Sequence, residues 1–309
     1  MNTNTAKKLK NVAAITGLAV GATYVVMRHI AKKQYPKSVY ADQPEEQNPL
    51  AGKQVVFVEN ESEPENADGM CGHLEAVGES EHIPTVYEKY LKRGMDIVLS
   101  FGGLLVLSPI YAVTAIAIKV DDPGPVIFKQ KRVGQGKEYF QLMKFRSMSV
   151  NTPKDVPTHM LQNGGITKVG AFIRKASIDE LPQLWNIFRG NMSVIGPRPA
   201  LWNQDFLTAE RDKYGANDVK PGLTGLAQIS GRDELEIPDK AKLDGDYAKA
   251  LKKSSLSGFI MDVKMFFGSV FSVLRSDGVV EGGTGAIAKE TEEANIIDTD
   301  DIKESTVEI

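Results

Sequence analysis

The sequence has very few residues of the kinds that build covalent or metal cross-links. It contains one cysteine, Cys71, among 309 residues, and four histidines. A single cysteine excludes an internal disulfide bond and fits a reducing compartment. We interpret Cys71 as a free surface thiol without a redox or nucleophilic role. The histidines do not show metal-ligand spacing and are interpreted as incidental. The glycine-rich segment 220–232 also lacks the spacing of a Walker A or dinucleotide-binding motif.

Charge is distributed unevenly along the chain although the total is nearly balanced. The net charge is +7 over residues 1–38, −10 over 39–86, +6 over 87–282 and −6 over 283–309. The moderately basic central region suits an anionic substrate or an anionic membrane surface. A solvated surface with a chance excess of basic residues explains the charge equally well.

The regions outside the centre predict an anchor, a linker and a tail. Residues 1–35 hold an apolar run, Val12–Met27, with basic residues on both sides. As a helix this run would be about 24 Å long, short of the ~30 Å hydrocarbon core. We predict an uncleaved membrane anchor, with a membrane-surface helix as the alternative. Residues 36–86 are expected to form an acidic flexible linker in which only Gln54–Val58 reads as a strand. Residues 283–309 are expected to form an acidic tail.

The strongest hydrophobic signal lies in residues 95–120, where Ile97–Ile118 carries no charge. Its middle is interrupted by Ser108-Pro109, and Gly102-Gly103 lies a turn and a half earlier. Proline removes a backbone hydrogen bond and kinks a helix, and Ser108 can satisfy a freed carbonyl. The residues alone leave two interpretations open, a kinked spanning helix and a re-entrant hairpin whose ends leave on one face.

The segment that follows predicts a small basic β-hairpin. Val126–Phe128 and Tyr139–Leu142 read as short strands around the loop 133–137. Basic residues cluster in Lys129–Arg132 and alternate with apolar ones in Lys144–Met148. Directly after a membrane segment, this pattern suits contact with phosphates or lipid headgroups. A solvated hairpin is an equally good interpretation.

Two adjacent acids, Asp179 and Glu180, are the most informative feature of the chain. Ser177-x-x-Glu180 matches a capping box, so both acids are explained as helix-capping residues. Pro182 argues for a helix that starts nearer Asp179 or Leu181, because proline prefers the first helical turn. The acids would then project from a loop–helix junction. On these residues alone, capping and catalysis remain equally open.

The catalytic interpretation is chemically coherent. A carboxylate can attack phosphorus as a nucleophile. A neighbouring carboxylate can hold Mg²⁺, which also binds substrate phosphates. Arginines and lysines can bind phosphate and offset charge during phosphoryl transfer. The candidate residues for these roles are Asp179, Glu180, Lys144, Arg146, Arg174 and Arg198.

Four motifs, taken in order, resemble the bacterial sugar transferase family, the monotopic phosphoglycosyl transferases or polyprenyl-phosphate glycosylphosphotransferases. Each motif is weak alone, but their order after a hydrophobic segment broken at Ser-Pro is specific. The resemblance covers about Tyr87–Gly282. The motifs are Lys144-Phe-Arg-Ser-Met148, Asp179-Glu-Leu-Pro-Gln183, Gly196-Pro-Arg-Pro199 and Lys220-Pro-Gly-Leu-Thr-Gly225.

The resemblance implies a reaction and a set of residue roles. A sugar 1-phosphate would pass from a UDP-sugar to undecaprenyl (polyprenyl) phosphate, with release of UMP and through a covalent aspartyl intermediate. It implies that Asp179 is the nucleophile, that Glu180 binds Mg²⁺ and that Arg198 contacts the nucleotide-sugar. Lys144, Arg146 and Arg174 would contact phosphates. The resemblance also implies that the break at Ser108-Pro109 makes the membrane segment re-entrant.

The predicted fold is α+β and mostly helical. It combines a re-entrant helix-break-helix, a cytoplasmic catalytic domain over 87–282, interfacial amphipathic helices and a small β-hairpin. The predicted location is the cytoplasmic face of a bacterial cell membrane, in exopolysaccharide or capsule synthesis. Expected partners are membrane lipids and the two substrates, with a homo-oligomer or glycan-assembly proteins as further candidates and no nucleic acid. Two rival hypotheses are a non-enzymatic scaffold and a glycosyltransferase that releases UDP. The sequence does not indicate which sugar is used.

Overall fold

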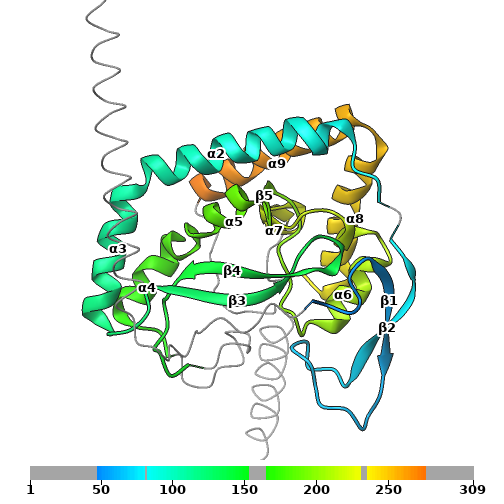
Figure 1. Ribbon diagram of the computed structural model, residues 1–309, viewed down its shortest axis with the longest axis horizontal. Helices are drawn as coiled ribbons and strands as arrows, with labels where there is room; N and C mark the ends of the chain where they lie inside the picture. Colours follow the sequence, from blue (N-terminus) through cyan, green and yellow to red (C-terminus); the bar gives the residue numbers. More distant parts are fainter. Residues whose placement is uncertain (1–46, 81, 153–164, 231–234, 276–309) are drawn as a thin grey trace, which may run out of the picture.

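The computed structural model describes residues 47–80, 82–152, 165–230 and 235–275. Figure 1 shows that the described part is rich in helices and holds small two-stranded sheets: β1–β2, β3–β4 and β5–β6. This arrangement confirms the predicted α+β class with mostly helical content. The apolar run 12–27 and the acidic tail 283–309 lie outside the described residues.

The predicted membrane segment forms two helices joined by a sharp break. A π-helical turn, η1 (Tyr87–Lys92), leads into α2 (Arg93–Val106), and α3 (Ser108–Asp121) follows at an angle of 60°. Pro109 lies in the first turn of α3, where its missing N–H costs no helical bond. The Ser108 hydroxyl donates to the Leu105 carbonyl at 2.8 Å. The break predicted at Ser108-Pro109 is therefore confirmed.

Across the described ranges, no unbroken helix is long and apolar enough to cross a membrane. The bent pair of η1–α2 and α3 meets the criteria of length and hydropathy when the two parts are taken together. In Figure 1 α2 runs along one edge of the molecule and α3 turns down the adjacent side. Apolar side chains are exposed along both helices, among them Val98 (71%) and Val113 (68%).

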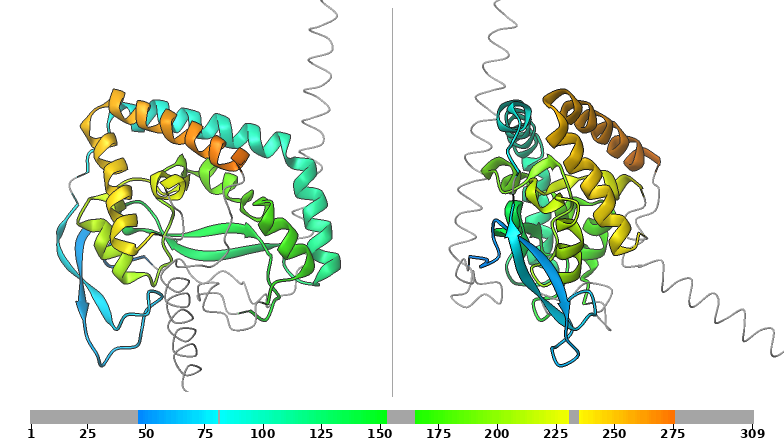
Figure 2. Two further views of the ribbon diagram at one scale, coloured as in Figure 1. Left: turned by 180° about the vertical axis from the view of Figure 1, so that it is seen from behind. Right: turned by 90° about the vertical axis from the view of Figure 1, so that its right-hand side faces the viewer.

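The last described helix, α9 (Ser255–Arg275), lies on the same edge as α2, whereas α8 (Ile237–Lys253) runs down the end of the molecule opposite α3 (Figures 1 and 2). Helix α8 leads into α9, which runs alongside η1 and α2. On one side of α9 the side chains of Met265 and Asp262 are buried, whereas those of Phe267 and Phe271 are exposed. Helix α9 is therefore an amphipathic helix of the kind predicted from the sequence.

The basic hairpin is formed as predicted, by β3 (Ile127–Val133) and β4 (Tyr139–Phe145) around the short turn η2 (Gln135–Lys137). The strands are antiparallel, with Phe128 opposite Lys144 and Arg132 opposite Phe140. Phe140 and Leu142 pack against Ile187 of α5 (Gln183–Arg189). The pleat therefore places Lys144 on the side of the hairpin that faces the acid pair.

The expectation of a flexible linker over 36–86 is wrong for residues 47–80. Strands β1 (Lys53–Glu59) and β2 (Gly72–Glu79) form an antiparallel pair that packs on α6 (Asp205–Asp212). The rings of Phe57 and Phe206 meet edge to face at 5.8 Å between centroids. The Val55 amide donates to the Asp212 carboxylate at 2.7 Å. The acidic composition of this segment did not indicate a hairpin, because α6, the helix on which the hairpin packs, lies far along the chain.

Two glycine-rich motifs meet in one tight junction. Strand β5 (Ser193–Ile195) pairs in parallel with β6 (Gly222–Thr224), and α7 (Leu226–Ser230) follows. A Cβ atom on Gly222 would lie 2.1 Å from the Gly196 nitrogen, and one on Gly225 would lie 2.3 Å from the Gly196 oxygen. Glycine is required here because the two backbones are in direct contact.

Candidate active site

The acid pair lies in a short 3-10 turn immediately before a helix. Helix α4 (Lys168–Lys175) leads into η4 (Ile178–Glu180), and Pro182 then occupies the N-cap position of α5. Ser177 adopts a left-handed conformation with φ of 52° and its side chain makes no capping bond. The capping-box interpretation is therefore wrong, and the helix start favoured by Pro182 is confirmed. Asp179 and Glu180 project from the junction.

Two basic side chains from distant segments hold Glu180. Lys144 Nζ lies 2.9 Å from Glu180 Oε1, and Arg198 Nη2 lies 2.8 Å from the same oxygen. Lys144 Nζ is also 4.0 Å from Asp179 Oδ2. Three of the motifs identified in the sequence therefore meet at one place.

The two carboxyl groups have opposite electrostatic environments. Burial raises the pKa of Asp179, the nearby charge of Glu180 raises it further, and Lys144 partly offsets the rise. Burial alone would also raise the pKa of Glu180. The charges and hydrogen bonds of Arg198 and Lys144 outweigh that effect and hold the Glu180 pKa well below its usual range. Adjacent acids with separated pKa values are typical of catalytic sites.

Arg174 and Arg146, both expected to contact phosphates, have different surroundings. Arg174, at the end of α4, lies close enough to lower the pKa of Asp179, and its Nε donates to the Ser147 hydroxyl at 2.8 Å. Arg146 is only 2% exposed, donates to the Pro125 carbonyl at 2.7 Å and forms an ion pair with Asp122. The prediction that Arg146 contacts substrate is therefore corrected. Its guanidinium holds the turn after α3, because that turn supplies both a carboxylate and a carbonyl.

Sequence reasoning missed a residue that fixes the arginine motif. Arg132 of β3 donates through Nη1 to the Pro199 carbonyl at 3.0 Å, and its Nη2 donates to Gln130 Oε1 at 2.6 Å. Pro199 follows Arg198 directly, so Arg132 orders the backbone that presents Arg198 to Glu180. The basic run Lys129–Arg132 was a visible signal, but the sequence does not show which of its members faces inward.

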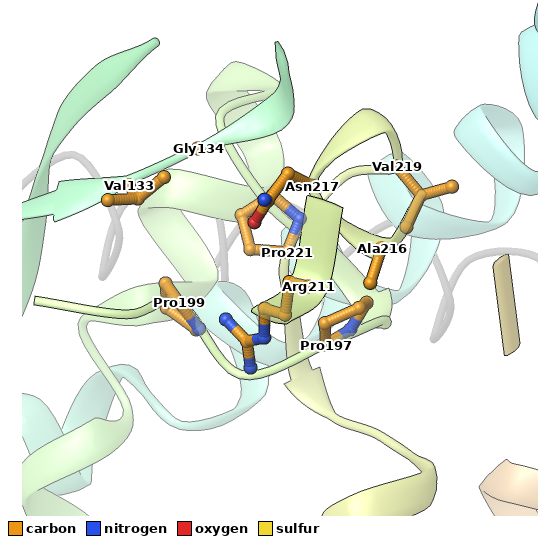
Figure 3. Close-up of a pocket in the computed structure, with 9 residues that line it drawn as sticks. All are labelled: Val133, Gly134, Pro197, Pro199, Arg211, Ala216, Asn217, Val219 and Pro221. Atoms are coloured by element: carbon orange, nitrogen blue, oxygen red, sulfur yellow. The ribbon is translucent and has the colours of Figure 1, made fainter. Parts of the chain in front are cut away.

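A small cavity lies behind the arginine motif and is shown in Figure 3. Its volume of about 10 Å³ is room for a single water molecule, so it is not a substrate pocket. Arg211, on its wall, donates to Asp244 Oδ2 at 2.6 Å and is buried. The cavity wall includes Val133, Pro197, Pro199, Arg211, Val219 and Pro221.

The donor set at the dyad fits a magnesium ion that is shared with a substrate. Within the described residues no group of three or more His, Cys, Asp or Glu side chains is placed to hold a metal ion. Mg²⁺ commonly takes one or two protein carboxylates and completes its coordination with phosphate oxygens and water. Glu180, the predicted ligand, supplies one such carboxylate, and Asp179 lies beside it. They do not form an all-protein cage.

The class of protein is defined by three features together: the broken helix pair, the basic hairpin and the acid dyad. In this class, acidic and arginine side chains lie beside an exposed apolar surface. The sequence profile of the bacterial sugar transferase family matches residues 87–276, and the chain belongs to this family. The match includes the broken helix, the dyad and both glycine motifs.

Several proteins of this family resemble the chain. The UDP-glucose:undecaprenyl-phosphate glucose-1-phosphate transferase of Escherichia coli K12 is 39% identical over 191 residues, which are 59% of this chain and 40% of that protein. The UDP-N-acetylgalactosamine-undecaprenyl-phosphate N-acetylgalactosaminephosphotransferase of Aeromonas hydrophila is 35% identical, over 63% of this chain and 46% of its own length. The exopolysaccharide production protein PSS of Rhizobium leguminosarum bv. phaseoli is 36% identical, over 60% of this chain and 95% of its own. The chain thus spans about half the length of the first two and nearly all of the third.

Proposed function

We propose that this chain transfers a sugar 1-phosphate from a UDP-sugar to undecaprenyl phosphate and releases UMP. The observation that carries the proposal is the dyad itself, a buried Asp179 beside a Glu180 that is held by Lys144 and Arg198. Relatives named as transferases for UDP-glucose and for UDP-N-acetylgalactosamine support the general reaction. Because those two names differ in the sugar, the sugar used by this chain is left open.

In the proposed first step, an Asp179 carboxylate oxygen attacks the phosphorus that bears the sugar. The bond between that phosphorus and the UMP oxygen breaks, and UMP leaves with the bonding electrons. In the second step, an oxygen of the lipid phosphate attacks the same phosphorus. The bond to Asp179 then breaks, which restores the carboxylate and yields a polyprenyl diphosphate sugar.

The basic residues around the dyad have distinct proposed roles. Lys144 lies near both carboxylates and lowers the cost of ionising the buried Asp179. Arg198, whose side chain is 47% exposed, can reach the nucleotide-sugar from its bond to Glu180. Arg174 adds positive charge near Asp179 and helps to lower its pKa. A Mg²⁺ ion held by Glu180 and the substrate phosphates would supply charge neutralisation during transfer.

The same proposal places the chain on the cytoplasmic face of a bacterial cell membrane. The support is the apolar surface that α2, α3 and α9 leave exposed. We propose that the α2–α3 pair enters the bilayer as a re-entrant segment and that α9 lies in the interface. Trp185 of α5 is 41% exposed, as an aromatic residue at headgroup level would be.

The decisive experiment measures the released nucleotide. Full-length chain in membranes that contain undecaprenyl phosphate is given a panel of UDP-sugars, and UMP and UDP are quantified separately. We expect UMP from one or a few sugars. UDP as the product would instead support the rival glycosyltransferase, and no turnover with any sugar would support the scaffold hypothesis.

Substitution of the nucleophile separates the dyad from the rest of the fold. Asp179→Asn should abolish UMP release even without lipid acceptor, because the amide cannot attack phosphorus. Asp205→Asn is the matched control: Asp205 is also a partly buried acid, with a pKa raised to about 6 by burial and by Asp68, but it lies on α6. Normal turnover by Asp179→Asn would reject the assignment of the nucleophile.

A further inference from the structure

Tyr111 of α3 makes a polar contact with the catalytic turn. Its hydroxyl donates to the backbone carbonyl of Leu181, the residue that follows Glu180. The side chain is buried, with 5% of its surface exposed. This bond joins the broken helix directly to the segment that carries the dyad.

The carbonyl that Tyr111 contacts belongs to the framework of the turn. The Leu181 amide closes η4 on the Ile178 carbonyl at 3.1 Å, and the Leu184 amide bonds to the Leu181 carbonyl at 3.0 Å. Leu181 is therefore the residue where the 3-10 turn becomes the first turn of α5. A donor fixed at its carbonyl restricts the direction in which Asp179 and Glu180 project.

The ring of Tyr111 reaches the second catalytic segment. It packs edge to face on Phe145, with 5.3 Å between ring centroids. Phe145 follows Lys144, whose ammonium lies within 4.0 Å of both carboxylates. Ile178 and Leu181, on either side of the dyad, pack against the same apolar cluster as Tyr111 and Phe145. One side chain of α3 therefore contacts both segments whose relative position sets the Lys144–dyad geometry.

The break in the helix explains why Tyr111 can make these contacts. Tyr111 lies in the first turn of α3, just after Ser108-Pro109, and the 60° bend turns α3 toward β4 and α4 (Figure 1). A straight continuation of α2 would carry Tyr111 away from Leu181. The bend thus has a consequence for the active site as well as for the path of the chain.

We propose that Tyr111 is a positioning residue for the Asp179–Glu180 dyad, acting through the Leu181 carbonyl and the Phe145 ring. The helix pair is thereby part of the active-site framework in addition to its contact with lipid. The kinetic part of this inference rests on the proposed transfer reaction, whereas the structural part does not.

The test compares two tyrosine-to-phenylalanine variants of the full chain in lipid. Tyr111→Phe removes the hydroxyl and keeps the ring that packs on Phe145. Tyr87→Phe is the matched control: Tyr87 is 3% exposed, begins η1 at the other end of the membrane segment, and donates to Asp262 at 2.6 Å. Both variants lose one buried hydrogen bond, so a general loss of stability should affect both alike.

Two measurements distinguish a positioning role from a structural one. In Tyr111→Phe the kcat for UMP release should fall about five- to tenfold, the effect of one lost hydrogen bond, while KM for the UDP-sugar stays unchanged. Amide hydrogen exchange in 178–184 should become faster in Tyr111→Phe and remain as in wild type in Tyr87→Phe.

The outcomes separate this proposal from the proposed reaction. If wild type releases UMP but Tyr111→Phe matches Tyr87→Phe in both kcat and local exchange, the positioning role is wrong. If exchange rises throughout the chain and not in 178–184 alone, Tyr111 is structural and the proposal fails. If wild type releases no UMP, the proposed reaction fails, and the exchange measurement alone decides the role of Tyr111.

Discussion

A buried charge network between η1 and α9 offers a quantitative test of how the helix pair is held to the catalytic domain. Asp262 of α9 is 4% exposed and accepts hydrogen bonds from Lys92 Nζ at 2.7 Å, Tyr87 at 2.6 Å and Tyr247 at 2.8 Å. Lys92 also donates to the Ile195 carbonyl at 2.9 Å. Asp262→Asn replaces the carboxylate by a neutral amide and leaves the Lys92 ammonium buried without its counter-charge.

The size of the effect follows from burial. Removing one partner of a buried ion pair costs about 3–5 kcal/mol. For a domain of this size each kcal/mol lowers Tm by about 2–4 °C, so Asp262→Asn should lower Tm by about 6–20 °C. The double variant Lys92→Met with Asp262→Asn removes both charges of this pair, and its Tm should recover part of the loss. Recovery should be incomplete, because the buried Asp96 also loses the nearby positive charge of Lys92.

Thermal unfolding of the detergent-solubilised full chain, followed at one scan rate, measures this effect. Lys249→Met is the control, because Lys249 and Asp246 form an exposed pair at 3.6 Å whose loss should cost less than about 1 kcal/mol. A Tm for Asp262→Asn within 2 °C of wild type, or a double variant that is less stable than the single one, would refute the reasoning.

Two further predictions concern the site. Because burial raises the pKa of Asp179, UMP release should fall as pH drops through a value above 3.8, and ionised Asp179 should cost stability that Asp179→Asn regains. Thermal scans at pH 7 should therefore place the Tm of Asp179→Asn at or above that of wild type, and a lower Tm would contradict the assigned cause. Arg132→Lys should lower kcat/KM about tenfold, because the single nitrogen of an ammonium does not reproduce the two separated guanidinium nitrogens that bond Gln130 and the Pro199 carbonyl. Steady-state kinetics that match wild type would show that Arg132 does not order the Arg198 loop.

The elements with strong local signals were predicted from the sequence. Proline restricts the backbone at its own position, so the break between α2 and α3 followed from Pro109 and the start of α5 followed from Pro182. The β3–β4 hairpin followed from alternating residues around a glycine-containing turn. These features depend on neighbours within a few positions.

The features that were missed depend on partners far along the chain. Phe57 of β1 packs on Phe206 of α6, so this helix stabilises the β1–β2 hairpin. The acidic composition of the hairpin does not indicate that partner. Arg146 and Arg132 both lie in short basic stretches of the sequence. Arg146 nevertheless holds the turn after α3, whereas Arg132 holds the loop that carries Arg198. Tyr111 lies within an apolar run, and nothing in that run indicates that its hydroxyl has a specific partner. Sequence patterns predict that a residue is buried more readily than they predict what it contacts.

The contact between the two glycine motifs has a consequence for protein engineering. Since the backbone of Gly196 touches those of Gly222 and Gly225, a side chain at any of these three glycines would displace the opposite segment. A chimera between relatives that exchanges only the Pro-Arg-Pro loop would combine segments from two proteins whose backbones are not matched to each other at this contact. Segments 196–199 and 220–225 should therefore be exchanged together when chimeras are made between members of the family.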